Sequence, residues 1–128
     1  SVRLLPGPLY SVNPLALRTR IRTLWENRRL VSLLEDTPVG TVAMIEVGAT
    51  NVGSIRHEHL EPGRPVQKGQ AKGWFEFGGS AIVTLFEPGR VRLSEDLLRH
   101  TREQIELYAR MGDRMGVLAE TPVPKGGP

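Results

Sequence analysis

The stretch WFEFGGSAIVTLF, residues 74–86, decides the fold of this chain. Aromatic residues lead into a pair of glycines, and Ala81–Phe86, which follows Ser80, is apolar enough to form a buried strand. Glycine adopts backbone conformations that other residues avoid, so the pair marks the point where one strand ends and the next begins. The segment therefore favours a β protein.

The segments before it also predict short strands. The chain holds 14 Gly and 10 Pro, 24 of its 128 residues, and these divide it into brief elements. Leu30–Leu34 and Thr41–Val47 are rich in strand-forming residues and flank the turn residues 36–40, which predicts a hairpin. Asn13-Pro14 predicts the start of a short or irregular helix that ends near Asn27.

Shorter elements are predicted for the remainder. Residues 56–66 are polar and predict an exposed loop, whereas Val91–Leu93 predicts a strand. Ser94 predicts the cap of a helix that runs to about Arg102. The fold class we expect is mainly β with minor α, a hybrid-barrel-like fold of short antiparallel strands with one or two short helices. We expect one domain over residues 1–118 and a flexible Pro- and Gly-rich tail over 119–128.

Composition narrows the classes of site. The absence of cysteine excludes disulfides and Cys-ligated metal centres, and no metal is expected. His57 and His59 flank Glu58 in a polar segment without a third ligand, so the sequence favours exposed surface for both, and for His100 as well. No apolar run approaches the roughly 20 residues that span a bilayer. Aromatic residues make up 5% of the chain and do not interleave with basic ones, so no nucleic acid partner is expected.

Basic residues gather around one tryptophan, although the net charge is only +3. Two interpretations stay open at this point, a solvated cationic face or a surface that meets anionic lipid headgroups, where tryptophan is favoured. The residues of this predicted membrane-surface patch are Arg18, Arg22, Trp25, Arg28 and Arg29.

The Gly-Gly-Ser bend has a chemical interpretation. A serine that follows glycine at a tight bend can attack the preceding carbonyl carbon with its own hydroxyl and form an ester. Elimination then releases a chain that ends at Gly79 and leaves dehydroalanine, which hydrolyses to a pyruvoyl cap at position 80. Gly-Gly-Ser is also common in ordinary turns, so the tripeptide alone leaves both interpretations open.

A longer pattern favours the chemistry. Residues 75–86 resemble the self-cleavage segment of the phosphatidylserine decarboxylase family, in which glycine precedes the serine and an apolar strand ending in Leu-Phe follows. The resemblance covers about residues 5–118. Further segments that carry it, in the same order, are Leu9–Pro14, Asn27–Arg29, Val47–Ile55, Val66–Gly69 and Gly112–Gly116.

The resemblance implies a lyase of phospholipid biosynthesis that is made as a zymogen. Autocatalytic cleavage at Gly79-Ser80 would make Gly79 the acyl donor and Ser80 the precursor of the pyruvoyl group, which is the cofactor. That group serves as the electron sink when phosphatidylserine loses carbon dioxide and becomes phosphatidylethanolamine. The implied partners are the phospholipid substrate, a membrane surface and the other cleavage chain. We expect peripheral attachment at the cytoplasmic side of a membrane, and a homo-oligomer is compatible with the sequence.

The chain departs from the family pattern in two places. Ala81 stands where the family commonly has threonine, and the family's upstream Asp and His would precede Ser1, so we expect the N-terminal part of the family domain to be absent. No family role passes to the three histidines. The alternative is an uncleaved, non-catalytic fragment or paralogue that acts as a scaffold or lipid-surface-binding module. A carrier or phosphotransfer domain ranks last, because no lysine sits on a suitable tight hairpin.

Overall fold

The computed structural model describes residues 1–50, 55–58, 61–76 and 80–119. The chain divides into two compact units, which we call the first unit and the second unit. The first consists of Ser1–Leu34 and Ala43–Leu85, and the second of Glu35–Val42 and Phe86–Pro128. Gly79, His59 and residues 120–128 lie outside the described part, and the predicted domain boundary at residue 118 stays a prediction.

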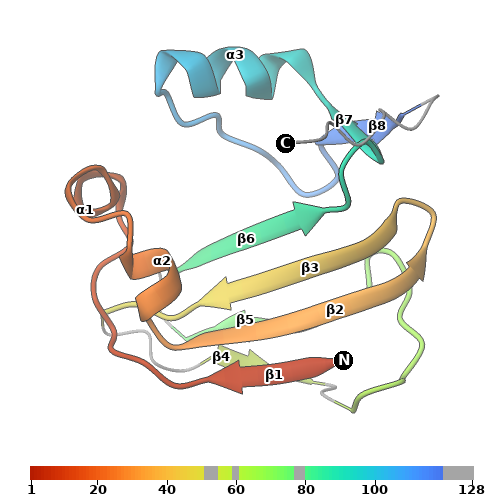
Figure 1. Cartoon of the computed structure of the whole chain (residues 1–128), viewed down its shortest axis with the longest axis horizontal. Coiled ribbons are helices and arrows are strands. Elements are labelled where there is room, and N and C mark those ends of the chain that lie inside the picture. Colours follow the sequence, from red (N-terminus) through yellow and green to blue (C-terminus); the bar gives the residue numbers. More distant parts are fainter. Residues whose placement is uncertain (51–54, 59–60, 77–79, 120–128) are drawn as a thin grey trace, which may run out of the picture. The chain divides into compact units, whose positions relative to one another are not determined.

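A four-stranded sheet with the order β1-β2-β3-β6 lies mostly in the first unit. Neighbouring arrows in this sheet point in opposite directions (Figure 1). The mainly antiparallel β architecture predicted from the sequence is confirmed. The described strands form one four-stranded and two two-stranded sheets and do not close into a barrel. The bounds are β1 Val2–Leu5, β2 Arg29–Thr37, β3 Gly40–Val47 and β6 Ala81–Phe86.

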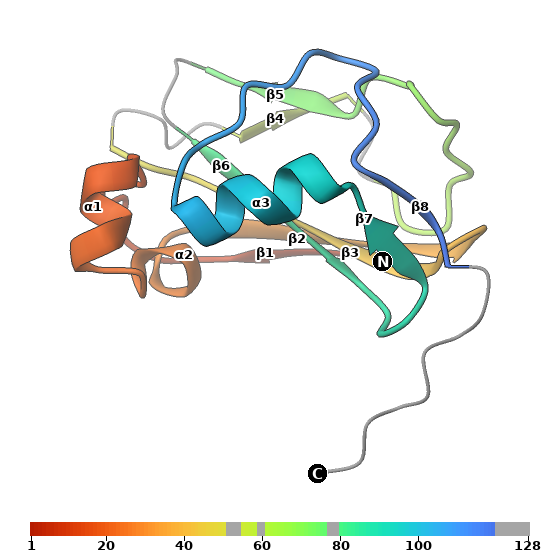
Figure 2. The same ribbon diagram turned by 90° about the horizontal axis from the view of Figure 1, so that it is seen from above.

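A separate hairpin packs on one face of this sheet. It consists of β4 (Ile55–His57) and β5 (Gly73–Phe75), with His57 opposite Gly73. A Cβ at Gly73 would lie 2.0 Å from the Arg56 carbonyl oxygen, so this pairing requires glycine. The prediction of a loop over residues 56–66 was therefore wrong for its first two residues, because their pairing with β5 makes them strand. Figures 1 and 2 place the hairpin and α2 on opposite faces of the sheet.

The predicted N-terminal helix is two short helices, α1 (Pro14–Thr19) and α2 (Thr23–Glu26). The side-chain oxygen of Asn13, Oδ1, accepts a hydrogen bond from Ala16 N at 2.7 Å, as its predicted capping role requires. Thr23 Oγ1 donates to Arg20 O at 3.0 Å in the break between the helices. Among the described residues, no helix is long and apolar enough to cross a membrane.

The second unit contains the turn of the β2–β3 hairpin, the strands β7 (Val91–Leu93) and β8 (Gly116–Leu118), and α3 (Glu95–Glu103). Strand and helix fall where the sequence predicts them. Ser94 stands at the N-cap position, but its hydroxyl donates to Arg114 O at 3.1 Å instead of accepting from the helix. Ser94 therefore joins α3 to the segment before β8.

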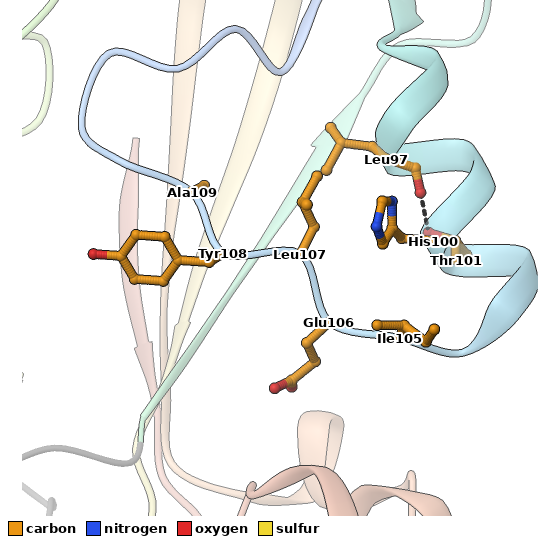
Figure 3. Close-up of a pocket in the computed structure, with 8 residues that line it drawn as sticks. All are labelled: Leu97, His100, Thr101, Ile105, Glu106, Leu107, Tyr108 and Ala109. Carbon is orange, nitrogen blue, oxygen red and sulfur yellow. Dashed lines mark hydrogen bonds between the residues drawn. The ribbon is translucent and has the colours of Figure 1, made fainter.

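A pocket of about 620 Å³ lies in the second unit between α3 and the segment 105–109 (Figure 3). His100 lines it, and His100 Nδ1 lies 2.7 Å from the carbonyl oxygen of Asp96, one turn earlier. His100 is thus partly buried rather than plain surface, while Tyr108 on the facing segment is 84% exposed. None of the predicted catalytic residues lies in this pocket.

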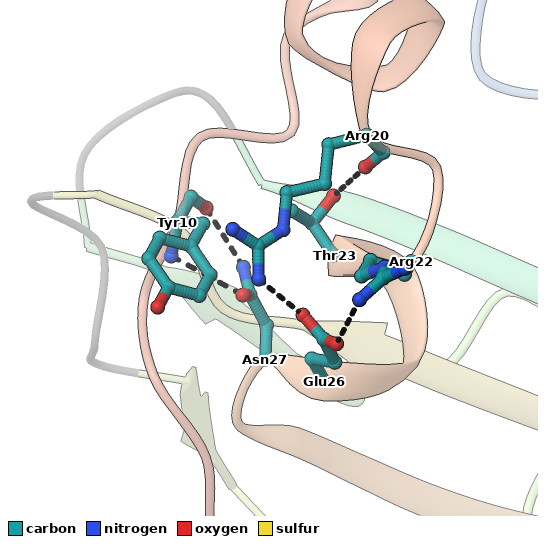
Figure 4. A network of polar contacts seen from close by, with 6 residues as sticks. All are labelled: Tyr10, Arg20, Arg22, Thr23, Glu26 and Asn27. Carbon is teal, nitrogen blue, oxygen red and sulfur yellow. Dashed lines mark hydrogen bonds and ion pairs between the residues drawn. The ribbon is translucent and has the colours of Figure 1, made fainter.

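A small apolar core in the first unit forms around Val12, Val47 and Ala49. The buried side chain of Asn27 locks the segments beside it, as Figure 4 shows in part. Its amide nitrogen donates to Tyr10 O at 2.7 Å and to Gly48 O at 2.8 Å, and its carbonyl oxygen accepts from Tyr10 N at 3.2 Å. One side chain therefore fixes the N-terminal segment, the end of α2 and the residues after β3.

We predict that Asn27→Ala lowers the free energy of unfolding by about 3 kcal/mol, because the buried carbonyl of Gly48 and the partly buried backbone groups of Tyr10 lose their partner. Asn27→Asp has a similar cost, because it keeps the acceptor but removes both donors and buries a charge. Urea titration measures the change. Asn13→Ala, which removes an exposed helix cap, is the matched control with an expected cost of about 1 kcal/mol. Equal losses for Asn27→Ala and Asn13→Ala would contradict the assignment.

Candidate functional site

Ser80 lies directly before β6, at the start of the strand that the sequence singles out. The residue is partly exposed, but its Oγ atom is buried and has no hydrogen-bond partner in the described part of the chain. A buried polar atom without a partner costs about 1–3 kcal/mol, so such atoms are few in folded proteins. The hydroxyl of Ser80 therefore forms no hydrogen bond that ties it to another described segment. Gly79, the other predicted residue, lies outside the described residues.

The residue after Ser80 is anchored in the apolar core. Ala81 packs against the cluster formed by Val12, Val47 and Ala49. Thr50 Oγ1 donates to Leu9 O at 2.9 Å, which adds a second tie beside the Asn27 hydrogen bonds. The backbone just beyond Ser80 is thus held by segments from before α1 and after β3, which are far apart in the sequence.

A buried polar cluster lies where the β4–β5 hairpin meets the sheet. It contains Glu46 from β3, His57 from β4 and Lys72, which precedes β5. Lys72 Nζ donates to Glu46 Oε2, and His57 Nε2 lies 3.8 Å from the same oxygen. The Glu46 side chain is 8% exposed and the His57 side chain 3%. A carboxylate can stay buried here because the ammonium group compensates its charge.

His57 was predicted to be exposed surface, and this prediction was wrong. Both ring nitrogens are buried and lack a hydrogen-bond partner among the described residues. Burial lowers the pKa of His57, Glu46 opposes that effect, and the ammonium group of Lys72 adds to it. The imidazole is therefore held neutral between a carboxylate and a cation.

These groups do not contact the candidate nucleophile. In the part of the chain that the structure describes, no carboxylate or imidazole forms a hydrogen bond with Ser80 Oγ. The same residues contain no group of three His, Cys, Asp or Glu side chains that could hold a metal ion. What Ser80 offers chemically is a hydroxyl without a hydrogen-bond partner among the described residues, directly before the well-anchored strand β6.

Glu26 lies beside the predicted basic patch and pairs with Arg22 of the patch and with the neighbouring Arg20 (Figure 4). Arg20 pairs with Glu26 at 2.8 Å and its guanidinium lies 4.5 Å from the centroid of the Tyr10 ring. Arg22 also approaches Glu26, at 3.8 Å. Trp25 remains 57% exposed. The other arginines of the patch, which Figure 4 does not label, are Arg18 in the last turn of α1, Arg28, which is exposed, and Arg29 at the start of β2.

Sequence reasoning missed the residues that organise the site. Asn27 appeared only as the predicted end of a helix and as part of a matching segment, and neither Glu46 nor Lys72 was singled out. A signal for Glu46 existed, because it is the one charged residue in the mostly apolar strand β3. Its partner could not be inferred, since Lys72 lies 26 residues further along the chain.

We predict that acid destabilises the fold through His57. Its pKa is lowered from 6.5 in the folded state, so the unfolded chain binds the proton first. The contribution of neutral His57 to the free energy of unfolding is complete above pH 6.5. It decreases as the pH falls below 6.5, by at most about 1.4 kcal/mol per pH unit. Urea titrations from pH 7.5 to 5 should show this slope in the wild type and a smaller one in His57→Gln. His100→Gln is the control, and a loss of slope there instead would refute the assignment.

Comparison with known proteins gives a consistent result. The model of the family described as phosphatidylserine decarboxylase matches residues 1–117. The phosphatidylserine decarboxylase proenzyme of Chlamydia muridarum (strain MoPn / Nigg) is 45% identical over 114 residues, 89% of this chain and 38% of that protein. The proenzyme of Desulfitobacterium hafniense (strain Y51) is 39% identical over 111 residues, 87% of this chain and 37% of that protein.

The chain thus spans less than two fifths of the length of these relatives. No solved structure matches it significantly. The family match nevertheless covers nearly all of the residues that the structure describes, including Ser80 and the strand after it. This chain belongs to the phosphatidylserine decarboxylase family.

Proposed function

We propose that this chain carries the self-cleavage site of a pyruvoyl-dependent phosphatidylserine decarboxylase, a carboxy-lyase that makes phosphatidylethanolamine. The observation that carries the proposal is the buried, unpartnered hydroxyl of Ser80. The proenzyme names of the relatives support it, since they describe proteins that are processed.

In the proposed cleavage, that hydroxyl is the nucleophile. Ser80 Oγ attacks the carbonyl carbon of Gly79, the C–N bond breaks, and an ester replaces the amide. Removal of the proton on the Ser80 Cα expels the Gly79 carboxylate from Cβ and leaves dehydroalanine. One water then displaces ammonia, and the second chain starts with a pyruvoyl group. An unsatisfied buried hydroxyl raises the energy of the uncleaved state, so forming the ester relieves a cost.

The residues around position 80 fit such a group. β6 is hydrogen-bonded to β3 in the sheet, and Ala81 packs in the core, so the new N-terminus would stay fixed after cleavage. The two cleavage chains would remain together for the same reason. Once formed, the pyruvoyl group supplies an electron sink for the decarboxylation.

We also propose that the protein acts as a peripheral protein at the cytoplasmic side of a membrane. Trp25 is the exposed aromatic residue of the predicted patch, and Arg28 and Arg29 have no ion pair among the described residues. Arginine and tryptophan together favour an anionic lipid surface.

The alternative function is an uncleaved scaffold or lipid-surface-binding module. The absence of a base in contact with Ser80 Oγ among the described residues favours it, because a serine hydroxyl is a weak nucleophile without one. A measurement of cleavage distinguishes the two functions, because the decarboxylase requires it and the scaffold does not undergo it.

We predict that the purified, denatured chain gives two masses, corresponding to residues 1–79 and 80–128, with the second blocked to Edman degradation. Ser80→Ala should give one mass, because the attacking oxygen is gone. A single unmodified mass in the wild type would refute cleavage in this polypeptide.

Hydroxylamine sharpens this test, because it cleaves esters more readily than amides. If the ester forms but elimination is slow, hydroxylamine should release a fragment that ends in a Gly79 hydroxamate and a second fragment that begins with an unmodified Ser80. Ser80→Ala should resist the reagent, and an equally resistant wild type would favour the scaffold.

For the membrane proposal, we predict that Trp25→Ala weakens co-sedimentation with phosphatidylglycerol-containing vesicles on the order of tenfold. Trp74→Ala is the matched control, since Trp74 is similarly exposed (54%) on the outer face of β5. Equal effects of the two substitutions would refute the placement of the membrane surface at Trp25.

A further inference from the structure

The open face of the first unit's sheet carries an apolar groove beside α2. Its volume is about 370 Å³, and its lining comes from all four strands of the sheet and from the short helix. Because alternate residues of a strand share a face, these residues lie opposite the polar cluster at Glu46. The lining residues are Leu5, Leu24, Trp25, Arg29, Val31, Ile45 and Val83.

Arg29 is the charged residue of this lining. Its Nε atom is buried without a hydrogen-bond partner, and it forms no ion pair with any described residue. The nearby guanidinium groups differ, since Arg20 and Arg22 share Glu26. A guanidinium beside apolar side chains is poorly hydrated, so an anion that can accept two hydrogen bonds is its natural partner.

Groove and guanidinium together fit one molecule that is anionic at one end and apolar at the other. We propose that the groove binds a single phospholipid, with its phosphate on Arg29 and part of an acyl chain against Leu24, Val31 and Val83. Trp25 lies at the exposed side of the groove, where its indole contacts the lipid. The choice of a phospholipid rests on the proposed function. That the ligand is anionic at one end and apolar at the other follows from Arg29 and the apolar residues of the lining.

The groove borders the candidate cleavage strand. Leu24 and Ile45 line the groove and, like Ala81, pack against the core formed by Val12, Val47 and Ala49. A lipid bound there is held next to the strand that begins after Ser80. Its site is nevertheless separate, since Ser80 is not part of the lining.

The experiment uses the full chain with Trp74→Phe and Ser80→Ala, in which Trp25 is the remaining tryptophan and cleavage cannot occur. Dioctanoyl phosphatidylserine, kept below its critical micelle concentration, should change Trp25 fluorescence saturably. Dihexanoyl phosphatidylserine should bind more weakly, by up to about fourfold for each methylene that no longer enters the groove. Inorganic phosphate should compete only at far higher concentration.

Arg29→Gln in this background should weaken dioctanoyl phosphatidylserine binding about tenfold or more, because a charge-assisted hydrogen bond is lost. Arg92→Gln removes the same charge from an exposed position on β7 in the second unit and should leave the affinity unchanged. Thermal unfolding of both variants shows whether the fold is intact. If Arg29→Gln unfolds the chain, the more conservative Arg29→Lys, which loses the fork geometry, replaces it.

Three results would overturn the inference. Equal losses of lipid affinity in the Arg29 and Arg92 variants would mean that the net positive charge of the chain, and not Arg29 itself, attracts the lipid. Full competition by inorganic phosphate without dependence on chain length would mean a simple phosphate site. No saturable change with either lipid would mean that the groove takes no phospholipid. Each of these results leaves the cleavage proposal standing, because the Ser80 variant is used throughout. A wild type that does not cleave would likewise leave a positive binding result intact.

Discussion

Asn27 has no exposed surface, and the arrangement of the first unit depends on its hydrogen bonds. The segment around Tyr10, the end of α2 and Gly48 after β3 are irregular backbone, whose polar groups cannot be satisfied by a sheet or a helix. One side-chain amide satisfies three of them and brings these segments together beside Val47 and Ala49. Ala81 packs on that surface, so the placement of Ser80 follows from an amide more than fifty residues earlier in the chain.

The two faces of the sheet differ in polarity. One face stabilises the fold through a buried ion pair, and the other carries the proposed binding groove. The face under the β4–β5 hairpin buries Glu46, whose charge is compensated by Lys72. The other face is apolar, and α2 covers one end of it, which leaves the groove with Arg29. Burying a charge is tolerable only with a partner. Glu46 has one within the first unit, whereas Arg29 in the groove has none among the described residues, which is why we propose an anionic ligand for it.

Ser80 combines a rigid setting with an unengaged hydroxyl. Most buried hydroxyl groups form hydrogen bonds and thereby stabilise the fold. The Oγ atom of Ser80 does not within the described residues, and the strand after it is fixed by packing and by pairing with β3. This combination is what self-cleavage needs from the scaffold. The base that activates the hydroxyl is a separate requirement, which neither Glu46 nor His57 meets by contact with it.

The sequence by itself determined the family, the mainly β character, a hairpin turn within residues 36–40, the cap at Asn13 and Ser80 as the residue of interest. The structure narrows that turn to residues 38–39, because β2 extends to Thr37 and β3 begins at Gly40. These features depend on neighbouring residues, through alternation, turn chemistry and a contiguous motif. Tertiary structure alone decided the burial of His57, the pairing of Glu46 with Lys72, the role of Asn27 and the groove beside Arg29. Each of these depends on contacts between segments far apart in the chain, and the polarity of a single segment does not reveal which side chain will cover it.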